Sequence, residues 1–388
     1  MKLYSPPIIS LKQKLVLGHG VNIVWNDVIG RYMRSKGEKI QYFYPSWNHQ
    51  GKRADQLDSS ELEKKILALE QDMRRELSCF GIEESYTLYR DTDEISKKNS
   101  QKYFMQLIQR GFIVEHNGEY LLDLSRIYTK TRIKEHLESV RYNPPHLKKR
   151  IFDLTKTLTG LYPISKRRRY ATPIPNSVFS INPIFDLAVS PALFSEEPVD
   201  YCIDGNRTLL RGTFIPFAIW SALFDKPFAR NCCAHGFLNL TDGLENMKIE
   251  KIKKSIGDPI IDSDVLRYCV LLPTNSLKDM IINQDTLMKG KKMIYRASNL
   301  AKYFVKHYGP QQNNQQGDEE IEKMIETMRI PFAMEIFRNR IYWLSKKIER
   351  GEKTTEDDIK EYQKLIKSIS PIFPSTVKRI DEILKWKA

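Results

Sequence analysis

Residues 1 to 50 restrict the fold of this 388-residue chain more than any other part of it. The short apolar stretch Lys14 to Leu17, expected as a strand, is broken by the glycines of Gly18-His19-Gly20. An amphipathic run from Asn22 to Arg34 follows, with apolar residues at the spacing of one helical face. The aromatic and β-branched segment Ile40 to Tyr44 then predicts a second strand. Strand, glycine turn, helix and strand together make the βαβ unit typical of nucleotide-binding α/β folds.

The rest of the chain is mainly helical by pattern. Helices are expected at Glu61 to Leu77, Ser100 to Arg110, Ile133 to Val140, Pro145 to Leu158, Arg211 to Leu223, Asp262 to Leu272, Gln284 to His307 and Glu356 to Ile369. Short strands are expected at Tyr120 to Leu124 and Cys232 to Phe237, and a polar loop at Gly309 to Asp318. We therefore predict an α/β fold in four parts. They are the first half of a Rossmann-like nucleotide-binding domain (1–58), a helical insertion (59–160), the second half of that domain (161–275) and a C-terminal helical bundle (276–388).

Composition narrows the possible partners and the compartment. Lysine and arginine number 62 against 48 acidic residues, a net charge of +14. This favours a polyanionic partner such as tRNA or nucleotide phosphates, although a lysine-rich solvated surface would give the same count. The five cysteines lack metal-binding spacing, so we expect buried thiols in a reducing cytoplasm and no structural metal. No apolar run is long enough to cross a bilayer, and no secretory signal is evident.

Two polar motifs point to phosphate chemistry. The first is Gly18-His19-Gly20 before a helix, where free backbone N–H groups and the helix dipole favour an anion. The second is the basic loop Lys251-Ile252-Lys253-Lys254-Ser255-Ile256-Gly257, which follows His235-Gly236-Phe237. Taken alone, a glycine turn is more often an ordinary loop, and a lysine run more often a solvated patch. Only the two together indicate a nucleotide site.

The order and spacing of these and other motifs resemble class I aminoacyl-tRNA synthetases of the valine, isoleucine, leucine and methionine group, with the valyl enzymes closest. Ser5-Pro6-Pro7 followed by Gly18-His19-Gly20 resembles the family's proline-led HIGH region. Further similar segments are Trp47-Asn48-His49-Gln50-Gly51, Ile164-Ser165-Lys166-Arg167 with Thr172-Pro173-Ile174-Pro175, the lysine loop as a KMSKS-like motif, Asp264 to Tyr268, and Leu365 to Pro374.

The resemblance implies an ATP-dependent ligase that activates a carboxylate as an acyl-adenylate and then transfers the acyl group to an acceptor. It implies catalytic roles for His19, Lys251, Lys254 and Ser255. The residues implied for ATP are Gly18, His19, Gly20, Asn22, Asp204, Gly205, His235, Gly236, Phe237, Lys251 and Lys254, with Mg²⁺ accompanying the nucleotide. Those implied for the acyl substrate are Pro6, Trp47, Asn48, His49 and Trp220. Taken alone, Trp47 and Trp220 are each more often plain core residues than pocket walls.

Several departures from the family pattern bear on the reaction. Val16 replaces the first histidine of HIGH, and Ile252 and Lys253 replace Met and Ser in the lysine loop. Asn48 stands where the family has the aspartate that holds the substrate ammonium, so the substrate is held differently or lacks a free ammonium group. Asn206 and Arg207 occupy positions where an acid is expected, which leaves Asp204 to substitute.

The expected acceptor is inferred from two features of the family that are missing or reduced in this chain. Relative to valyl enzymes the editing domain is absent and the helical tail is short. These features slightly favour a small-molecule or carrier amine as acceptor over the 3′ end of a tRNA. A catalytically inactive relative that binds tRNA or has a regulatory role is the alternative from a different class. A monomer is expected by analogy with the family.

Overall fold

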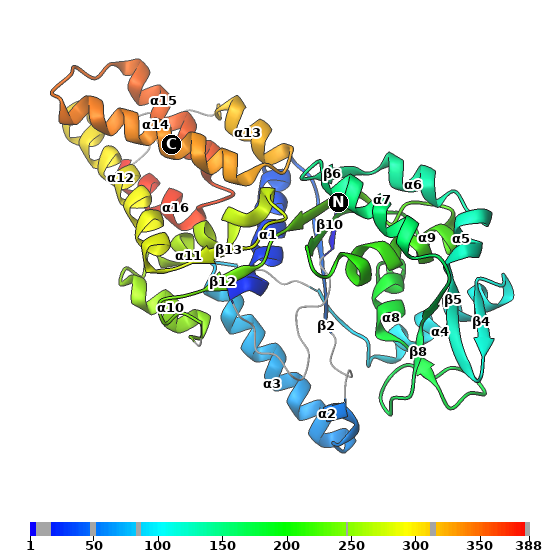
Figure 1. Cartoon of the computed structure of the whole chain (residues 1–388). Coiled ribbons are helices and arrows are strands. Elements are labelled where there is room, and N and C mark those ends of the chain that lie inside the picture. Colours follow the sequence, from blue (N-terminus) through cyan, green and yellow to red (C-terminus); the bar gives the residue numbers. More distant parts are fainter. Residues whose placement is uncertain (5–16, 47–51, 83–86, 246, 311–315, 385–388) are drawn as a thin grey trace. The chain divides into compact units, whose positions relative to one another are not determined.

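The computed structural model describes residues 1–4, 17–46, 52–82, 87–245, 247–310 and 316–384 (Figure 1). Each of two compact units is assembled from separate stretches of chain. Unit 1 comprises Met1–Leu15, Lys39–Arg74 and Glu84–Ala234, and unit 2 comprises Val16–Glu38, Arg75–Glu83 and His235–Ala388. The four-part division drawn from the sequence stays a prediction.

A six-stranded sheet forms the centre of unit 1 and confirms the α/β prediction. Its strand order is β3 (Thr87–Arg90), β2 (Gln41–Ser46), β1 (Lys2–Tyr4), β10 (Val199–Gly205), β11 (Ala229–His235) and β6 (Arg141–Asn143). The pairs β1–β2, β1–β10, β2–β3 and β11–β6 run parallel. Six of the seven residues of β10 are buried, as expected for a strand covered on both faces.

Helices and a smaller sheet surround this centre within unit 1. The helices are α2 (Lys52–Asp55), most of α3 (Ser59–Ser78), α4 (Glu94–Gln109), α5 (Leu124–Lys130), α6 (Ile133–Ser139), α7 (Leu147–Thr157), α8 (Pro183–Val189) and α9 (Ile215–Phe224). The antiparallel sheet joins β4 (Ile113–His116), β5 (Glu119–Asp123) and β7 (Leu161–Pro163). Asn117 and Gly118 turn the β4–β5 hairpin with φ of 51° and 77°, which suits the right-handed twist of the two strands. A two-stranded sheet, β8 (Ser165–Lys166) and β9 (Ser180–Ile181), follows.

Unit 2 is a helical assembly around one wholly buried helix. All ten residues of α11 (Asp262–Leu271) are buried. Around it lie α1 (Gly20–Ser35), α10 (Ile249–Ile256), α12 (Gln284–Tyr308) and α16 (Pro374–Leu384), each in contact with α11. The remaining elements are α13 (Glu319–Glu326), α14 (Ile330–Glu349), α15 (Glu356–Ile369) and the parallel pair β12 (Leu238–Leu240) and β13 (Met280–Ile282).

Arg267, which is wholly buried on α11, ties unit 2 together. Its guanidinium donates to the Asp27 carboxylate on α1 at 2.6 Å. The same group also donates to the backbone carbonyls of Phe80, Pro371 and Ile372 at 3.2, 2.9 and 2.6 Å. A buried charge is tolerable because it is both paired and hydrogen-bonded.

Most of the predicted elements are confirmed, and three predictions need correction. The first strand is Lys2–Tyr4, while Leu17 begins a 3₁₀ turn (Leu17–His19) and residues 14–16 lie outside the described residues. The helix expected from Arg211 begins as a π-helix, Leu210–Phe214, because Gly212 and Thr213 lie against the Asp204 carboxylate. The lysine loop is a helix, α10, which is described below. Among the described residues, no helix is both long enough and apolar enough to cross a membrane.

Candidate functional site

The start of α1 has the form of an anion site. Leu17–His19 makes a 3₁₀ turn that leads directly into α1 at Gly20. The side chain of His19, the N-cap residue, makes no capping hydrogen bond to the first turn of α1, and that turn carries no acidic residue. The positive end of the helix dipole lies next to His19.

The two glycines of this turn have different surroundings. A Cβ atom on Gly20 would lie 2.4 Å from Cζ of Phe80, so Gly20 is fixed by packing inside unit 2. A Cβ atom on Gly18 would meet no atom within 4 Å, so packing does not require glycine there. The open space beside Gly18 is consistent with a position that a ligand approaches.

His19 is largely shielded from solvent. Burial lowers the pKa of its imidazole from the ordinary value of 6.5. The ring is therefore neutral at pH 7 and carries one N–H that can donate to a phosphate oxygen without bringing a full charge.

The lysine segment is a helix and not a loop. Ile249, Ile252 and Ile256 recur at helical spacing and are buried, whereas Lys251 and Lys254 are exposed on the other side. This amphipathic pattern explains why residues 249–256 adopt a helix once they pack against α11 and α12.

The three lysines of α10 have different surroundings. Lys254 pairs with Glu250 one turn earlier at 2.7 Å, and Lys253 pairs with Asp262 of α11 at 3.4 Å. Lys251 takes part in no ion pair among the described residues. The Ser255 hydroxyl donates to the Ile252 carbonyl at 2.7 Å, so its proton is already committed to the helix backbone.

His235 joins the end of β11 to α1. Its Nδ1 lies 2.6 Å from the Gly236 carbonyl, and its Nε2 contacts the side-chain amide of Asn22. Burial lowers the pKa of His235 to about 4, so the ring is neutral and has one N–H. Both partner atoms, the Gly236 carbonyl oxygen and Asn22 Oδ1, are acceptors, so the single N–H of the ring donates to one of them.

Gly236 must be glycine for steric reasons. A Cβ atom there would lie 1.8 Å from the carbonyl oxygen of Lys278. The next residue, Phe237, donates its backbone N–H to Asp279 at 2.9 Å and accepts from the Met280 N–H at 2.8 Å. The His-Gly-Phe segment is thus a tightly packed corner that leads from β11 into β12.

The remaining described candidates lie in unit 1 and are held inside the protein. Asp204 is buried and accepts from the Gly205 N–H at 2.7 Å, from Thr208 at 2.5 Å and from Thr213 at 3.0 Å. Burial raises the pKa of this carboxyl to about 6. Trp220 is wholly buried and donates to the Ala188 carbonyl. These surroundings favour a core role for Trp220 over a pocket wall.

The structure brings part of the predicted site together. In unit 2, Asn22 and His235 are in contact, and the turn that holds Gly18 and His19 touches β12, which follows Phe237. The helix that begins after His19 and the helix that carries Lys251 and Lys254 both pack on α11. Pro6, Trp47, Asn48 and His49 lie outside the described residues.

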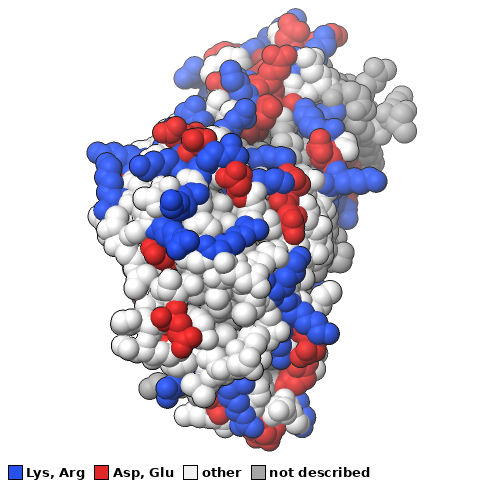
Figure 2. Space-filling model, turned by 90° about the vertical axis from the view of Figure 1, so that its right-hand side faces the viewer, with Lys and Arg blue, Asp and Glu red and all other residues white. Residues whose placement is uncertain are grey.

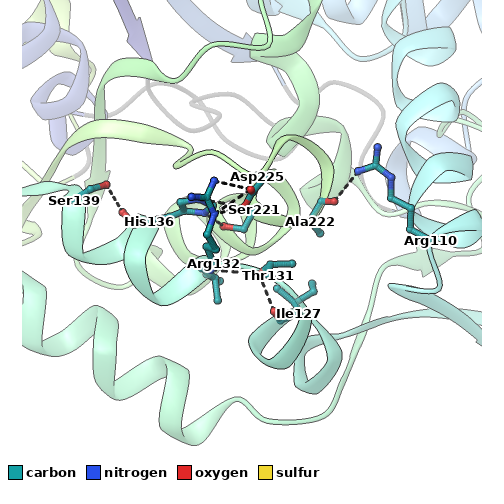
Figure 3. Close-up of polar contacts among 10 residues, drawn as sticks. Arg110, Ile127, Thr131, Arg132, His136, Ser139, Ser221, Ala222 and Asp225 are labelled. Carbon is teal, nitrogen blue, oxygen red and sulfur yellow. Dashed lines mark hydrogen bonds and ion pairs between the residues drawn. The ribbon is translucent and has the colours of Figure 1, made fainter.

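A polar cluster at the end of α9 was not expected from the sequence. Arg110 donates to the carbonyls of Ala222 and Leu223, Arg132 forms a bidentate pair with Asp225, and His136 lies 2.9 Å from the Ser221 hydroxyl (Figure 3). Cations at the carbonyl end of a helix stabilise its dipole. The cluster is therefore explained as the C-terminal cap of α9. Its members are far apart along the chain, so no local signal could have revealed it.

Exposed aromatic rings of α14 lie beside basic side chains of α14 and α12. Tyr342 and Trp343 are 47% and 57% exposed. Arg296 and Lys346 lie over the Tyr342 ring at 4.9 and 5.7 Å, and Lys347 lies 5.4 Å from the Trp343 ring centre. We call these five residues the aromatic–basic face. Figure 2 shows a different face of the molecule, on which Lys and Arg side chains gather in the upper part with acidic groups among them and a broad uncharged area lies below.

Comparison with known proteins supports the same type of fold. Residues 5–143 match the family model described as tRNA synthetases class I (M). The fold is that of methionyl-tRNA synthetase from Mycobacterium tuberculosis in complex with methionyl-adenylate, with a TM-score of 0.73 and 14% identity over 98% of this chain and 93% of that one. A second structure of that enzyme bound by methionyl-adenylate gives a TM-score of 0.71 and 12% identity over the same shares. No functionally curated protein matches the chain by sequence.

The chain is thus similar to class I aminoacyl-tRNA synthetases in fold, and over its first third in sequence as well. Both of these structures are of a methionyl enzyme, and the expected closeness to valyl enzymes is not confirmed. The C-terminal tail is short relative to valyl enzymes. The fold similarity covers 93% of the methionyl-tRNA synthetase chain.

Proposed function

We propose that this protein is an ATP-dependent ligase of the class I aminoacyl-tRNA synthetase type. It activates an amino acid or a related carboxylate as an acyl-adenylate and passes the acyl group to an acceptor. The observation that carries this proposal is the arrangement of unit 2. A neutral histidine at the start of α1 and a helix that presents Lys251 and Lys254 belong to elements packed on one buried helix, α11.

In the first step, a carboxylate oxygen attacks the α-phosphorus of ATP while the bond to the pyrophosphate oxygen breaks. Such a reaction needs positioning and charge neutralisation more than a protein nucleophile. His19 and the first N–H groups of α1 would donate to phosphate oxygens, and Lys251 would neutralise the leaving pyrophosphate. Lys254 can contribute to this neutralisation only if its ion pair with Glu250 breaks, and the exposed position of Lys254 allows that. Mg²⁺ would accompany the phosphates of ATP.

An apolar amino acid is the proposed acyl substrate. Methionine is the first to test, because the two similar structures contain methionyl-adenylate. Asn48, in place of the expected aspartate, argues that the substrate lacks a free ammonium group or that another group holds it. Such a substrate would be an N-acylated or deaminated acid.

For the acceptor, the aromatic–basic face favours RNA. Bases stack on exposed aromatic rings, and lysine and arginine attract the phosphate backbone. A small-molecule or carrier amine, which the sequence alone slightly favours, needs no such surface. We therefore propose a tRNA as acceptor, with the amine as the second candidate.

A screen of ATP–pyrophosphate exchange tests activation without presuming the acceptor. The purified protein is given ATP, labelled pyrophosphate and a panel that includes methionine, other amino acids, and N-acylated and deaminated acids. Exchange with at least one carboxylate is expected, followed by acid-precipitable labelling of total tRNA. Exchange without labelling would favour the amine acceptor. Absence of exchange, together with no ATP binding at millimolar concentration, would instead indicate the inactive relative.

A further inference from the structure

The lysine helix α10 ends in a set of polar contacts with the C-terminal helices. Gly257 closes the helix in the left-handed region, with φ of 74°. The Lys291 ammonium on α12 donates to the Ile256 carbonyl at 2.5 Å, which satisfies one of the free carbonyls at the helix end. The end of α10 is thus capped by a side chain from the C-terminal part of the chain.

Asp258 forms the second half of this connection. Its Oδ2 accepts from the Tyr295 hydroxyl of α12 at 2.7 Å and from Arg379 of α16 at 3.2 Å. Its Oδ1 accepts from the Ile260 N–H at 3.0 Å. Burial opposes ionisation of Asp258, but these hydrogen bonds outweigh it and lower the pKa of the carboxyl. Asp258 is therefore held as a carboxylate between α10 and α11.

The two contacts from α12 act together because of their spacing. Lys291 and Tyr295 are one helical turn apart on α12 and point to the same end of α10. The ion pair of Lys253 with Asp262 at 3.4 Å also joins a side chain of α10 to α11. We call the hydrogen bonds from Lys291, Tyr295 and Arg379 to Ile256 and Asp258 the polar clasp. Among the described residues, this clasp is the main set of hydrogen bonds that anchors α10.

We propose that Lys291, Tyr295 and Arg379 are positioning residues for the lysine helix. They fix the C-terminal end of α10, and through it the places of Lys251 and Lys254. The consequence for catalysis rests on the proposed function, whereas the anchoring itself does not. A shift of about 1 Å in a positioning group can lower a rate by roughly 10²-fold, so a clasp of this kind would affect turnover without touching a ligand.

Tyr295→Phe removes one hydroxyl and tests the anchoring. Hydrogen exchange measured by mass spectrometry should show amides of residues 249–257 exchanging roughly tenfold faster than in the unmodified protein, with α14 unchanged. Tyr303→Phe is the matched control: it lies two turns further along α12, and no hydrogen bond of its hydroxyl is recorded among the described residues. Lys291→Met gives a second, independent measurement at the same helix end. Unchanged exchange of α10 in both Tyr295→Phe and Lys291→Met would overturn the proposal.

Pyrophosphate exchange separates positioning from simple stability. Tyr295→Phe should lower kcat about tenfold or more while KM for the carboxylate stays within about twofold, because the lysines act on the departing pyrophosphate. Lys291→Arg should keep most of the activity that Lys291→Met loses. Faster exchange of α10 amides with unchanged kcat would refute the positioning role. If no carboxylate supports exchange in the unmodified protein, the proposed function fails, and the clasp is judged on hydrogen exchange alone.

Discussion

Gly18 allows the proposed nucleotide site to be tested by a single methyl group. Its backbone is outside the left-handed region, and a Cβ atom there meets nothing within 4 Å. Gly18→Ala should therefore keep the thermal stability of the protein or raise it by up to about 1 kcal/mol. If ATP approaches this backbone, the methyl group should raise the KM for ATP about tenfold or more in pyrophosphate exchange. An unchanged KM would argue against Gly18 as a contact of the nucleotide. Gly20→Ala is the contrasting variant, since its methyl group would collide with Phe80 and lower stability.

Asp204 should make the stability of the protein depend on pH. Burial raises its pKa from 3.8 to about 6, so the folded protein holds this proton more tightly than the unfolded chain does. The stability linked to the proton is complete below about pH 4 and is lost as the pH rises through 6, by roughly 3 kcal/mol in total. Between pH 4 and 6, the unfolding free energy of the unmodified protein should fall by about 2 kcal/mol relative to that of Asp204→Asn. The other titrating groups, among them Asp264 with a pKa of about 6 and His235 with a pKa of about 4, contribute equally to both proteins. An identical slope in both proteins, measured by urea denaturation, would show that Asp204 does not titrate as described.

The lysine helix gives the clearest expectation among the elements. Lys254→Met should lower kcat of pyrophosphate exchange by about 10²-fold, because neutralising charge that develops only in the transition state affects turnover and not substrate binding. Lys251→Met should have a similar effect. Lys248→Met is the control, since this exposed lysine precedes α10 and lies outside the motif. Equal activity of all three variants would remove α10 from the catalytic proposal.

Elements with local signals were predictable, and those shaped by distant contacts were not. The bounds of α15 agree with the expected Glu356 to Ile369, because Thr355 and Asp358 form a capping box and Pro371 follows. The helix of the lysine segment was missed although Ile249, Ile252 and Ile256 already carry helical spacing. The π-helix before α9 depends on Asp204, which lies on another element, so no local pattern reveals it.

The architecture of the whole chain was predictable only in outline. A βαβ signal at the start indicates a parallel sheet, and that sheet is present. The sequence does not indicate that two compact units are each assembled from three separate stretches. The contact between Arg267 and Asp27 joins residues 240 positions apart and depends on the burial of both groups. In the same way, the His19 and lysine motifs can be named from sequence, but their common neighbour α11 appears only in three dimensions.

The net charge of +14 leads to a prediction about RNA binding by the full chain. If the acceptor is a tRNA, its affinity should fall steeply with salt, since each neutralised phosphate releases counterions. Arg296→Met should weaken binding and reduce the slope of log K against log salt by about one. Trp343→Ala should weaken binding by about 1–3 kcal/mol and leave the slope unchanged, because stacking on a base carries no charge. Fluorescence anisotropy with labelled tRNA at several salt concentrations measures both quantities. A flat salt dependence, or equal binding by Trp343→Ala, would remove the aromatic–basic face from RNA recognition and leave the amine acceptor as the better candidate.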